Sequence, residues 1–158
     1  MIHIDKRGSP FDVRIYSPED YPRLEEMYDS FTPKAKFQGM PPIDKEACRV
    51  WLKNLTNKGE NFLAWREGNV IGHVVVLPDF SKNDAEYLIF LGRSDRGCGV
   101  GSELTRAVIQ RAKELELKTI WLTVDAYNFR ATRLYKKFGL QFYAAYRSQS
   151  ERMMTLEL

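Results

Sequence analysis

Apolar residues in the first third of the chain recur at spacings that predict one strand followed by two helices. Polar and apolar residues alternate from Phe11 to Tyr16, which is typical of a half-buried strand. Ser17-Pro18-Glu19-Asp20 has a capping serine, a proline and acidic residues, which together indicate a helix start. A second helix is predicted from a cap at Asp44 to a stop at Gly59. The apolar stripes expected to face the core are Tyr21, Leu24, Met27, Tyr28 and Phe31 in the first helix, and Ala47, Val50, Trp51 and Leu55 in the second.

The remainder of the chain predicts strands with two further helices between them. Two alternating runs flank Glu67-Gly68-Asn69, which is a hairpin signal. The predicted elements are strands at Asn61 to Arg66, Val70 to Leu77 and Ala85 to Leu91, a helix from Ser102 to Leu115, a strand from Thr119 to Val124 that reads as buried on both faces, a helix from Asn128 to Phe138, and strands at Gln141 to Arg147 and Arg152 to Leu158. The order β-α-α-β-β-β-α-β-α-β-β predicts an α/β protein (α+β) with a mixed sheet and helices on both faces.

Length and composition favour one folded domain over residues 1–158. The chain has 158 residues, of which 44% are apolar, enough for a full core. With 24 basic and 21 acidic residues the net charge is +3, which is too balanced for a nucleic-acid-binding protein. Cys48 and Cys98 form no metal or redox motif, so no metal is expected. No apolar run predicts a signal peptide or a membrane span, so we expect a cytoplasmic protein without a membrane partner.

The segment Arg96-Gly97-Cys98-Gly99-Val100-Gly101 lies between a predicted strand and a predicted helix. Glycines allow the backbone to approach a ligand closely, and a helix N-terminus presents unpaired N–H groups and a positive dipole. Arg96 adds a positive charge beside them. The segment therefore predicts a phosphate-binding loop.

Three other interpretations of this loop are weaker. A nucleoside-triphosphate loop requires a lysine where Ser102 follows Gly101. A dinucleotide fingerprint requires a third glycine, and too little chain follows Val124 to complete a doubly wound sheet. A glycine-rich turn that binds nothing is the remaining alternative.

Two blocks of sequence together indicate a family. Arg96-x-x-Gly99-x-Gly101 resembles the acyl-CoA pyrophosphate loop of the GNAT N-acetyltransferase superfamily. The stretch from Val124 to Leu140, with Asn128, Ala131, Leu134-Tyr135 and Gly139, looks like the second block of that family, in the expected order. The resemblance covers about residues 85 to 142. It implies a GNAT-like, mostly antiparallel mixed sheet and transfer of an acetyl group from acetyl-CoA, as co-substrate, to an amine without a metal.

The resemblance also implies roles in binding the co-substrate. The strand from Ala85 to Leu91 would separate from the strand at Thr119, leaving backbone groups of Phe90 and Leu91 to pair with the pantetheine arm. Asn128 matches the asparagine that contacts this arm, although a helix cap explains it equally well. The pyrophosphate would bind at Arg96 and at the N–H groups of Gly97, Cys98, Gly99, Val100, Gly101 and Ser102.

Catalysis needs a base for the amine and an acid for the leaving thiolate. Tyr135 matches the family's tyrosine that faces the sulfur, and Glu86 lies where many members place a glutamate as base, directly or through water. His73 is an alternative base. Cys98 as a nucleophile is disfavoured because the chain offers so few bases to activate it.

The acceptor is the least determined part. The resemblance places its site at Thr32 to Ile43 and about Tyr143 to Arg152, and these segments do not identify the amine: a protein lysine or N-terminus and a small amine both remain open. The acyl-chain preference and the oligomeric state, a homodimer included, also remain open. A non-catalytic acyl-CoA-binding regulatory module is the rival function.

Overall fold

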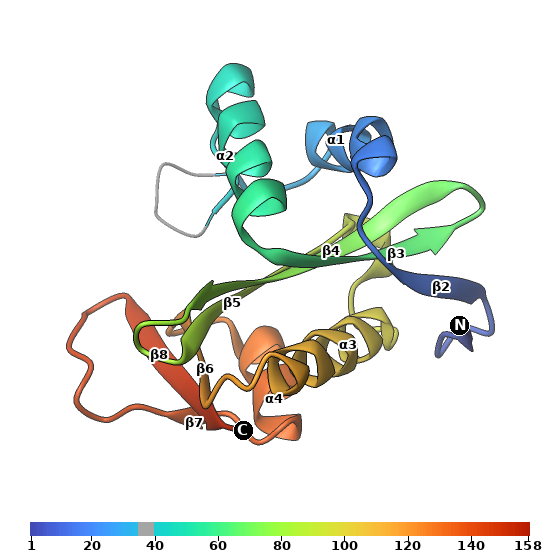
Figure 1. Ribbon diagram of the computed structural model, residues 1–158. Coiled ribbons are helices and arrows are strands. Elements are labelled where there is room, and N and C mark those ends of the chain that lie inside the picture. Colours follow the sequence, from blue (N-terminus) through green and yellow to red (C-terminus); the bar gives the residue numbers. More distant parts are fainter. Residues whose placement is uncertain (35–39) are drawn as a thin grey trace.

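The computed structural model describes residues 1–34 and 40–158 and shows one eight-stranded sheet with the order β1-β2-β3-β4-β5-β6-β8-β7 (Figure 1). Neighbouring strands are antiparallel except β5 and β6, which are parallel. The strands are β1 (Ile2–Ile4), β2 (Pro10–Ile15), β3 (Glu60–Arg66), β4 (Asn69–Asp79), β5 (Asp84–Leu91), β6 (Thr119–Asp125), β7 (Gln141–Phe142) and β8 (Glu151–Glu157). The helices are α1 (Tyr21–Asp29), α2 (Lys45–Lys58), α3 (Val100–Glu114) and α4 (Phe129–Lys137), with short 3-10 turns η1 (Pro18–Asp20) and η2 (Arg93–Asp95).

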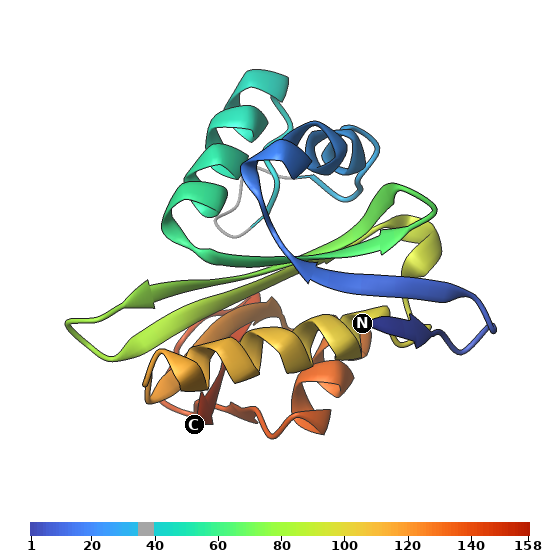
Figure 2. The ribbon, with the colours of Figure 1, turned by 45° about the vertical axis from the view of Figure 1, so that its right-hand side comes forward.

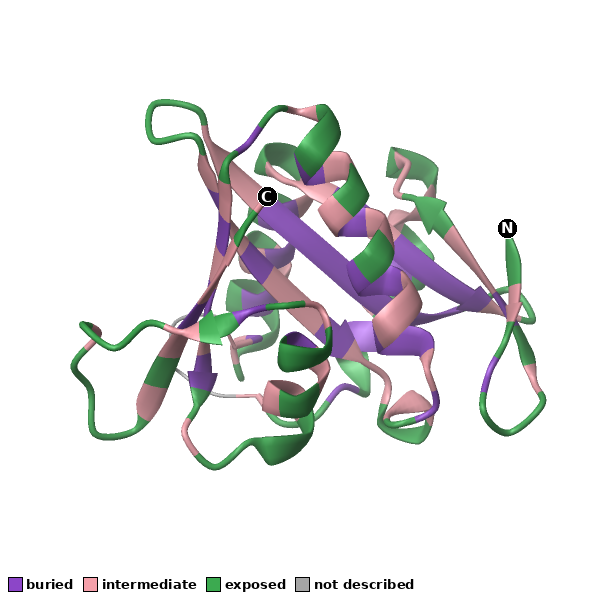
Figure 3. Ribbon diagram, turned by 90° about the horizontal axis from the view of Figure 1, so that it is seen from below, coloured by how far each residue is buried: buried purple, intermediate pink, exposed green. Residues whose placement is uncertain are grey.

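The helices form a layer on each face of the sheet. Figures 1 and 2 show α1 and α2 on one side and α3 and α4 on the other. Side chains alternate along β5, so Phe90 joins the core beneath α1 and α2, and Tyr87 joins the core beneath α3 and α4. The buried stretch of β4 runs between both layers (Figure 3). Each face of β5 is thus fixed by a separate core.

Local signals explain where several elements begin and turn. The Asp44 side chain accepts a hydrogen bond from the Ala47 N–H (2.8 Å) and so caps α2 as predicted. Glu67 and Gly68 both have positive φ, +50° and +79°, which is the two-residue turn that suits a β3–β4 hairpin. The predicted sequence of elements and the mixed, mostly antiparallel sheet are confirmed.

Some details of the prediction are wrong. β1 adds an N-terminal strand that its short apolar alternation did not reveal, and β7 is much shorter than the predicted Gln141 to Arg147. In α2, Ala47 is exposed and Val50 is 55% exposed, whereas Cys48 and Leu52 join the predicted Leu55 on the face toward the sheet. β6 alternates between buried and partly buried residues, because α3 and α4 cover one of its faces more fully than the other face is covered. Across the described residues, no helix combines the length and apolar content that crossing a membrane requires.

Candidate active site

β5 and β6 form a fork in the middle of the sheet. They pair only where Asp84–Glu86 lies beside Thr119–Trp121. β6 continues along β8 as far as Asp125, whereas β5 continues along β4 as far as Leu91. Among the described residues, the second half of β5 therefore has no partner strand on its β6 side, as expected for the gap that would hold a pantetheine arm.

The register of β4 and β5 decides which backbone groups face this fork. The Gly92 N–H donates to the Ile71 carbonyl (2.8 Å), so these residues form a hydrogen-bonded pair of the ladder. Such pairs recur every second residue, and Phe90 opposite His73 is therefore another. The backbone groups of Phe90 are directed at β4, and the expectation that they remain free is wrong.

Ile89 and Leu91 take the opposite orientation. Their N–H and C=O groups point away from β4 and toward the fork, because backbone direction alternates along a strand. The backbone of Leu91 thus stays a candidate for pairing with the arm, although its carbonyl also accepts from Arg96 Nε (3.1 Å), and Ile89 takes the place of Phe90 as a candidate. The sequence places β5 correctly but contains nothing that fixes this alternation, which depends on the pairing with β4.

The glycine-rich loop joins the end of the fork to α3. Gly97 and Gly99 have φ of +72° and +104°, a region that side chains other than glycine rarely adopt. Gly99 is the N-cap, so α3 begins at Val100 and not at the predicted Ser102. The first helical residues, Val100, Gly101 and Ser102, have N–H groups without an acceptor inside the helix. These donors and the helix dipole make the loop suitable for an anion.

Three cations from two other segments, α4 and the turn between β1 and β2, lie close to this loop. The Lys137 Nζ lies 3.0 Å from the Ser102 Oγ. A Cβ at Gly97 would lie 3.8 Å from the Arg130 Cζ, and one at Gly99 would lie 4.0 Å from the Lys6 Cγ. None of these three cations was predicted from the sequence, although Arg130 and Lys137 lie within the block that carries the family resemblance.

Arg96 ties the loop to the end of β5 and to the α1 side of the fold. Its Nε donates to the Leu91 carbonyl (3.1 Å), its Nη2 donates to the Thr32 carbonyl, and its guanidinium lies 5.2 Å from the centre of the Phe31 ring. Burial lowers the pKa of Arg96, and the positive charges of Arg130 and Arg93 lower it further. Arg96 therefore both shapes the loop and contributes to its positive charge.

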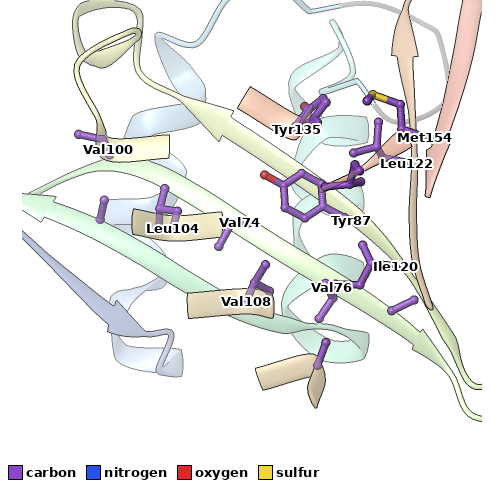
Figure 4. Packing of buried hydrophobic residues seen from close by; sticks show 14 of the residues in the cluster. Val74, Val76, Tyr87, Val100, Leu104, Val108, Ile120, Leu122, Tyr135 and Met154 are labelled. Atoms are coloured by element: carbon purple, nitrogen blue, oxygen red, sulfur yellow. The ribbon is translucent and has the colours of Figure 1, made fainter. Parts of the chain in front are cut away.

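Tyr135 lies where α4 covers the base of the fork. It is 8% exposed and packs edge-to-face on Tyr87, with 5.5 Å between ring centres, and Figure 4 shows both near Leu122 of β6. Burial raises the pKa of Tyr135, so its hydroxyl stays protonated near neutral pH. The Thr105 hydroxyl donates to the Gly101 carbonyl (2.7 Å) and lies 2.7 Å from the Tyr87 hydroxyl, so Tyr87 is the donor in that pair. The Tyr87 hydroxyl is thus bonded within the core between β5 and α3.

Asn128 is the N-cap of α4, because its Oδ1 accepts a hydrogen bond from the Ala131 N–H (3.2 Å). The structural alternative for Asn128 is therefore confirmed. Its amide nitrogen projects from an exposed residue and remains a candidate contact for the pantetheine arm.

Glu86 is the last residue of β5 that pairs with β6. Alternation places its side chain on the α1 and α2 face, with Phe90, whereas Tyr135 lies on the opposite face. Burial raises the pKa of Glu86 above its ordinary value. The two candidate catalytic residues thus flank the fork from opposite faces of the sheet.

His73 is excluded as a base. It is fully buried, with Tyr28 Oη 2.7 Å from its Nδ1 and Asn61 Oδ1 2.7 Å from its Nε2. Asn61 uses its amide nitrogen to donate to the Leu55 carbonyl (3.0 Å), so its oxygen accepts from the Nε2–H of His73. Burial lowers the pKa of His73 to about 3. Both ring nitrogens are committed, and the neutral ring is part of the core.

Cys98 is also unavailable as a nucleophile, because it is 1% exposed and its Sγ donates to the Asp95 carbonyl (3.1 Å). Of the two expected acceptor segments, the first, Thr32 to Ile43, is only partly described. Lys36, Phe37 and Gln38 lie outside the described residues. The segment from Tyr143 to Ser150 connects the two last strands and is bonded to β8 through the Tyr143 N–H and the Met153 carbonyl (2.8 Å).

Comparisons with known proteins agree with this geometry. A model of the acetyltransferase (GNAT) family matches residues 21–140. The chain is similar to the spermine/spermidine N(1)-acetyltransferase of Bacillus subtilis (strain 168), with 32% identity over 100 residues. A second protein, from Bacillus subtilis subsp. natto, matches to the same extent. The match covers 58% of this chain and spans 66% of the length of each curated relative.

Solved structures share the whole fold at low sequence identity. The GNAT domain of S. lividans PAT has a TM-score of 0.85 and 15% identity, covering 100% of this chain and 96% of that chain. The yncA protein of Salmonella typhimurium, solved with its cofactor acetyl-CoA, has a TM-score of 0.74 and 16% identity, covering 94% of each chain. Identities this low support the fold and carry no residue role.

Proposed function

The chain belongs to the acetyltransferase (GNAT) family, and from this premise we propose that it transfers an acetyl group from acetyl-CoA to the amino group of an acceptor. The observation that carries the proposal is the fork between β5 and β6, which opens directly toward the glycine-rich loop and α3. A linear molecule with an amide-containing arm and a pyrophosphate fits this combination, because the strand edge can pair with the amides and the helix start can hold the phosphates.

In this proposal the arm pairs with the backbone of Ile89 and Leu91, and the pyrophosphate binds the N–H groups of Gly97 to Ser102. Asn128 contributes its amide nitrogen to the arm. Arg130 and Lys137 neutralise phosphate charge from α4. The acetyl group then lies at the base of the fork, between the faces that carry Tyr135 and Glu86.

The reaction follows from those two side chains. The Glu86 carboxylate removes a proton from the ammonium form of the acceptor, directly or through a water molecule, because only the neutral amine has a lone pair to attack with. The amine nitrogen bonds to the thioester carbonyl carbon, and the carbon–sulfur bond breaks. The Tyr135 hydroxyl donates its proton to the departing thiolate, and the nitrogen, which still carries two protons, loses one of them to the tyrosinate. Tyr135 is thereby regenerated, and the proton that Glu86 accepted passes to solvent. The products are an N-acetylated amine and free coenzyme A.

We propose a primary amine as the acceptor. Polyamines should be tested first, because one relative is a spermine/spermidine N(1)-acetyltransferase and the other is described as a probable spermine N(1)-acetyltransferase. Their similarity spans only part of their length, so amino acids and peptide N-termini belong in the same panel.

The proposal is tested by measuring release of free coenzyme A thiol from acetyl-CoA with each amine. Release that depends on one class of amine, and that falls strongly in Tyr135→Phe, supports acetyl transfer. Acetyl-CoA binding without release, across spermine, spermidine, amino acids and peptides, would instead favour a non-catalytic acyl-CoA-binding module.

A further inference from the structure

The turn between β1 and β2 lies against the glycine-rich loop. The Lys6 N–H donates to the Cys98 carbonyl (2.8 Å). The guanidinium of Arg7 donates to the Ser94 carbonyl (2.6 Å) and to the Arg96 carbonyl (3.3 Å). The turn precedes residues 21–140, which the family model matches, whereas the carbonyls that it contacts lie within them.

The turn is itself held firmly in place. The Asp5 carboxylate has a side chain only 2% exposed and accepts the N–H groups of Arg7 (2.8 Å) and Ser9 (2.9 Å). The Arg66 Nη2 lies 3.0 Å from Asp5 and 3.3 Å from Asp95, which belongs to η2 at the start of the loop. One shielded guanidinium therefore links the N-terminal turn to the loop, where an ion pair is screened less than at the surface.

The bonded carbonyls determine where the neighbouring N–H groups point. In a planar trans peptide, the C=O of one residue and the N–H of the next point in opposite directions. Because the Arg96 carbonyl faces the turn, the Gly97 N–H points away from it. The Gly99 N–H points away in the same manner, because the Cys98 carbonyl accepts from Lys6.

We infer that the turn from Asp5 to Ser9 is a positioning element of the acetyl-CoA site, with Arg7 as its main residue. It orients the N–H groups of Gly97 and Gly99 toward the pyrophosphate and prevents the Arg96 and Cys98 carbonyls from facing the same anion. The donors on these carbonyls also polarise the peptide groups and strengthen the N–H groups as donors. The inference rests on the proposed function.

Two substitutions separate this role from a simple contribution of charge. Arg7→Ala removes the guanidinium. Arg7→Lys keeps the positive charge but replaces the planar guanidinium, which bonds to two carbonyls, with a single ammonium group. We expect both to weaken acetyl-CoA binding about tenfold, measured by calorimetry, which fits the loss of a charge-assisted hydrogen bond. The kcat at saturating acetyl-CoA and the KM for the acceptor should stay close to those of the wild type. Arg14→Ala is the matched control. It also removes one positive charge, but the Arg14 side chain contacts Asp12 and Trp65 and not the loop.

Hydrogen exchange of the ligand-free protein gives a second readout. The Lys6 amide is protected only while it is bonded to Cys98, so Arg7→Ala should accelerate its exchange and Arg14→Ala should not. An Arg7→Lys variant that binds like the wild type, or unchanged exchange in Arg7→Ala, would overturn the inference and leave the proposed function standing. A wild-type protein that binds no acetyl-CoA would instead overturn the proposed function itself.

Discussion

Burial assigns opposite roles to the two titratable side chains that could serve as base. His73 lies in the core and shares both ring nitrogens with Tyr28 and Asn61, so taking up a proton would break a satisfied network. Glu86 is only partly buried and ends the paired part of β5 beside the fork. A carboxyl group with a raised pKa is a better base for an amine than one with the ordinary value, and the environment of Glu86 provides this.

Glu86→Gln should reduce kcat/KM near neutral pH by about a hundredfold, because the glutamine cannot accept a proton. In the wild type, kcat/KM should rise with pH through an ionisation above the usual carboxyl range, and the variant should lack this limb. At high pH the free amine needs no base, so the two rates should converge. A pH series of initial rates checks this, and a defect of equal size at every pH would indicate that Glu86 only orients the acceptor.

The same substitution should increase stability at neutral pH. Since burial raises the pKa of Glu86, its protonated form is favoured by the fold, and that contribution is lost as pH rises through the folded pKa. Glutamine resembles the protonated form at every pH. The melting temperature of Glu86→Gln should exceed that of the wild type at pH 7, and the difference should vanish below pH about 4. Equal melting temperatures at pH 7 would contradict burial of the charge.

Tyr135→Phe should lower kcat by about ten- to a thousandfold and leave the KM for acetyl-CoA nearly unchanged, because in the proposed reaction the hydroxyl acts on the leaving thiolate. Tyr87→Phe is the matched control. Its hydroxyl is bonded to Thr105, so its loss should lower the free energy of unfolding and leave kcat close to that of the wild type. Steady-state kinetics with chemistry shown to be rate-limiting distinguishes the two. An unchanged kcat in Tyr135→Phe would leave that ring with a packing role only.

At the scale of elements, the glycine-rich loop connects β5 to α3 through backbone conformations with positive φ, which residues other than glycine rarely adopt. Gly99 caps α3 with φ of +104°, and the Gly101 position leaves only 3.2 Å between a Cβ and Leu91. Side chains at these positions would strain the loop or press on the fork. The proposed binding of phosphate thus depends on the same geometry that ends β5 and starts α3.

Gly99→Ala should weaken acetyl-CoA binding at least tenfold, because a side chain at positive φ shifts the loop away from its present conformation. Gly68→Ala is the control: it imposes a similar strain at φ of +79° in the β3–β4 turn, where a Cβ meets no other atom within 4 Å. Both variants should lose about 1 kcal/mol of stability. Equal affinities in the two variants would mean that the phosphates bind elsewhere.

The sequence predicts elements better than it predicts their pairing. The glycine loop, the Asp44 cap and the Glu67-Gly68 turn are local, and each follows from a few adjacent residues. The orientation of Ile89 depends on how β4 pairs with β5, and no local signal contains it. Arg7 likewise acts on residues about ninety positions away, so only the folded chain shows that it contacts the loop.

At the scale of the whole molecule, the fork divides the sheet into two parts with different support. β6 follows β8, and β5 follows β4, so no strand bonds hold the two parts together beyond Glu86 in the described chain. Packing of Tyr135 on Tyr87 and the shared core beneath α3 and α4 hold the fork at its base. A ligand in the fork would therefore add backbone bonds where the sheet itself has none.

Acetyl-CoA should stabilise the protein more than its phosphates alone can. A ligand at a hundred times its Kd adds about 2.7 kcal/mol to the stability of the native state, which for a domain of this size raises the Tm by about 5–10 °C. Thermal melts with acetyl-CoA, ATP and NAD at the same concentration check this, and only acetyl-CoA should raise the Tm by that amount.

Hydrogen exchange at individual backbone amides distinguishes binding in the fork from binding at the loop alone. If the arm pairs with the strand edge, acetyl-CoA should slow hydrogen exchange at the Ile89 and Leu91 amides, whereas ATP should slow it only near Gly97 to Ser102. The Phe90 amide serves as an internal reference, because it already faces β4 and should exchange slowly with or without ligand. Slowing confined to the loop with acetyl-CoA would place the arm outside the sheet and would contradict the role assigned to the fork.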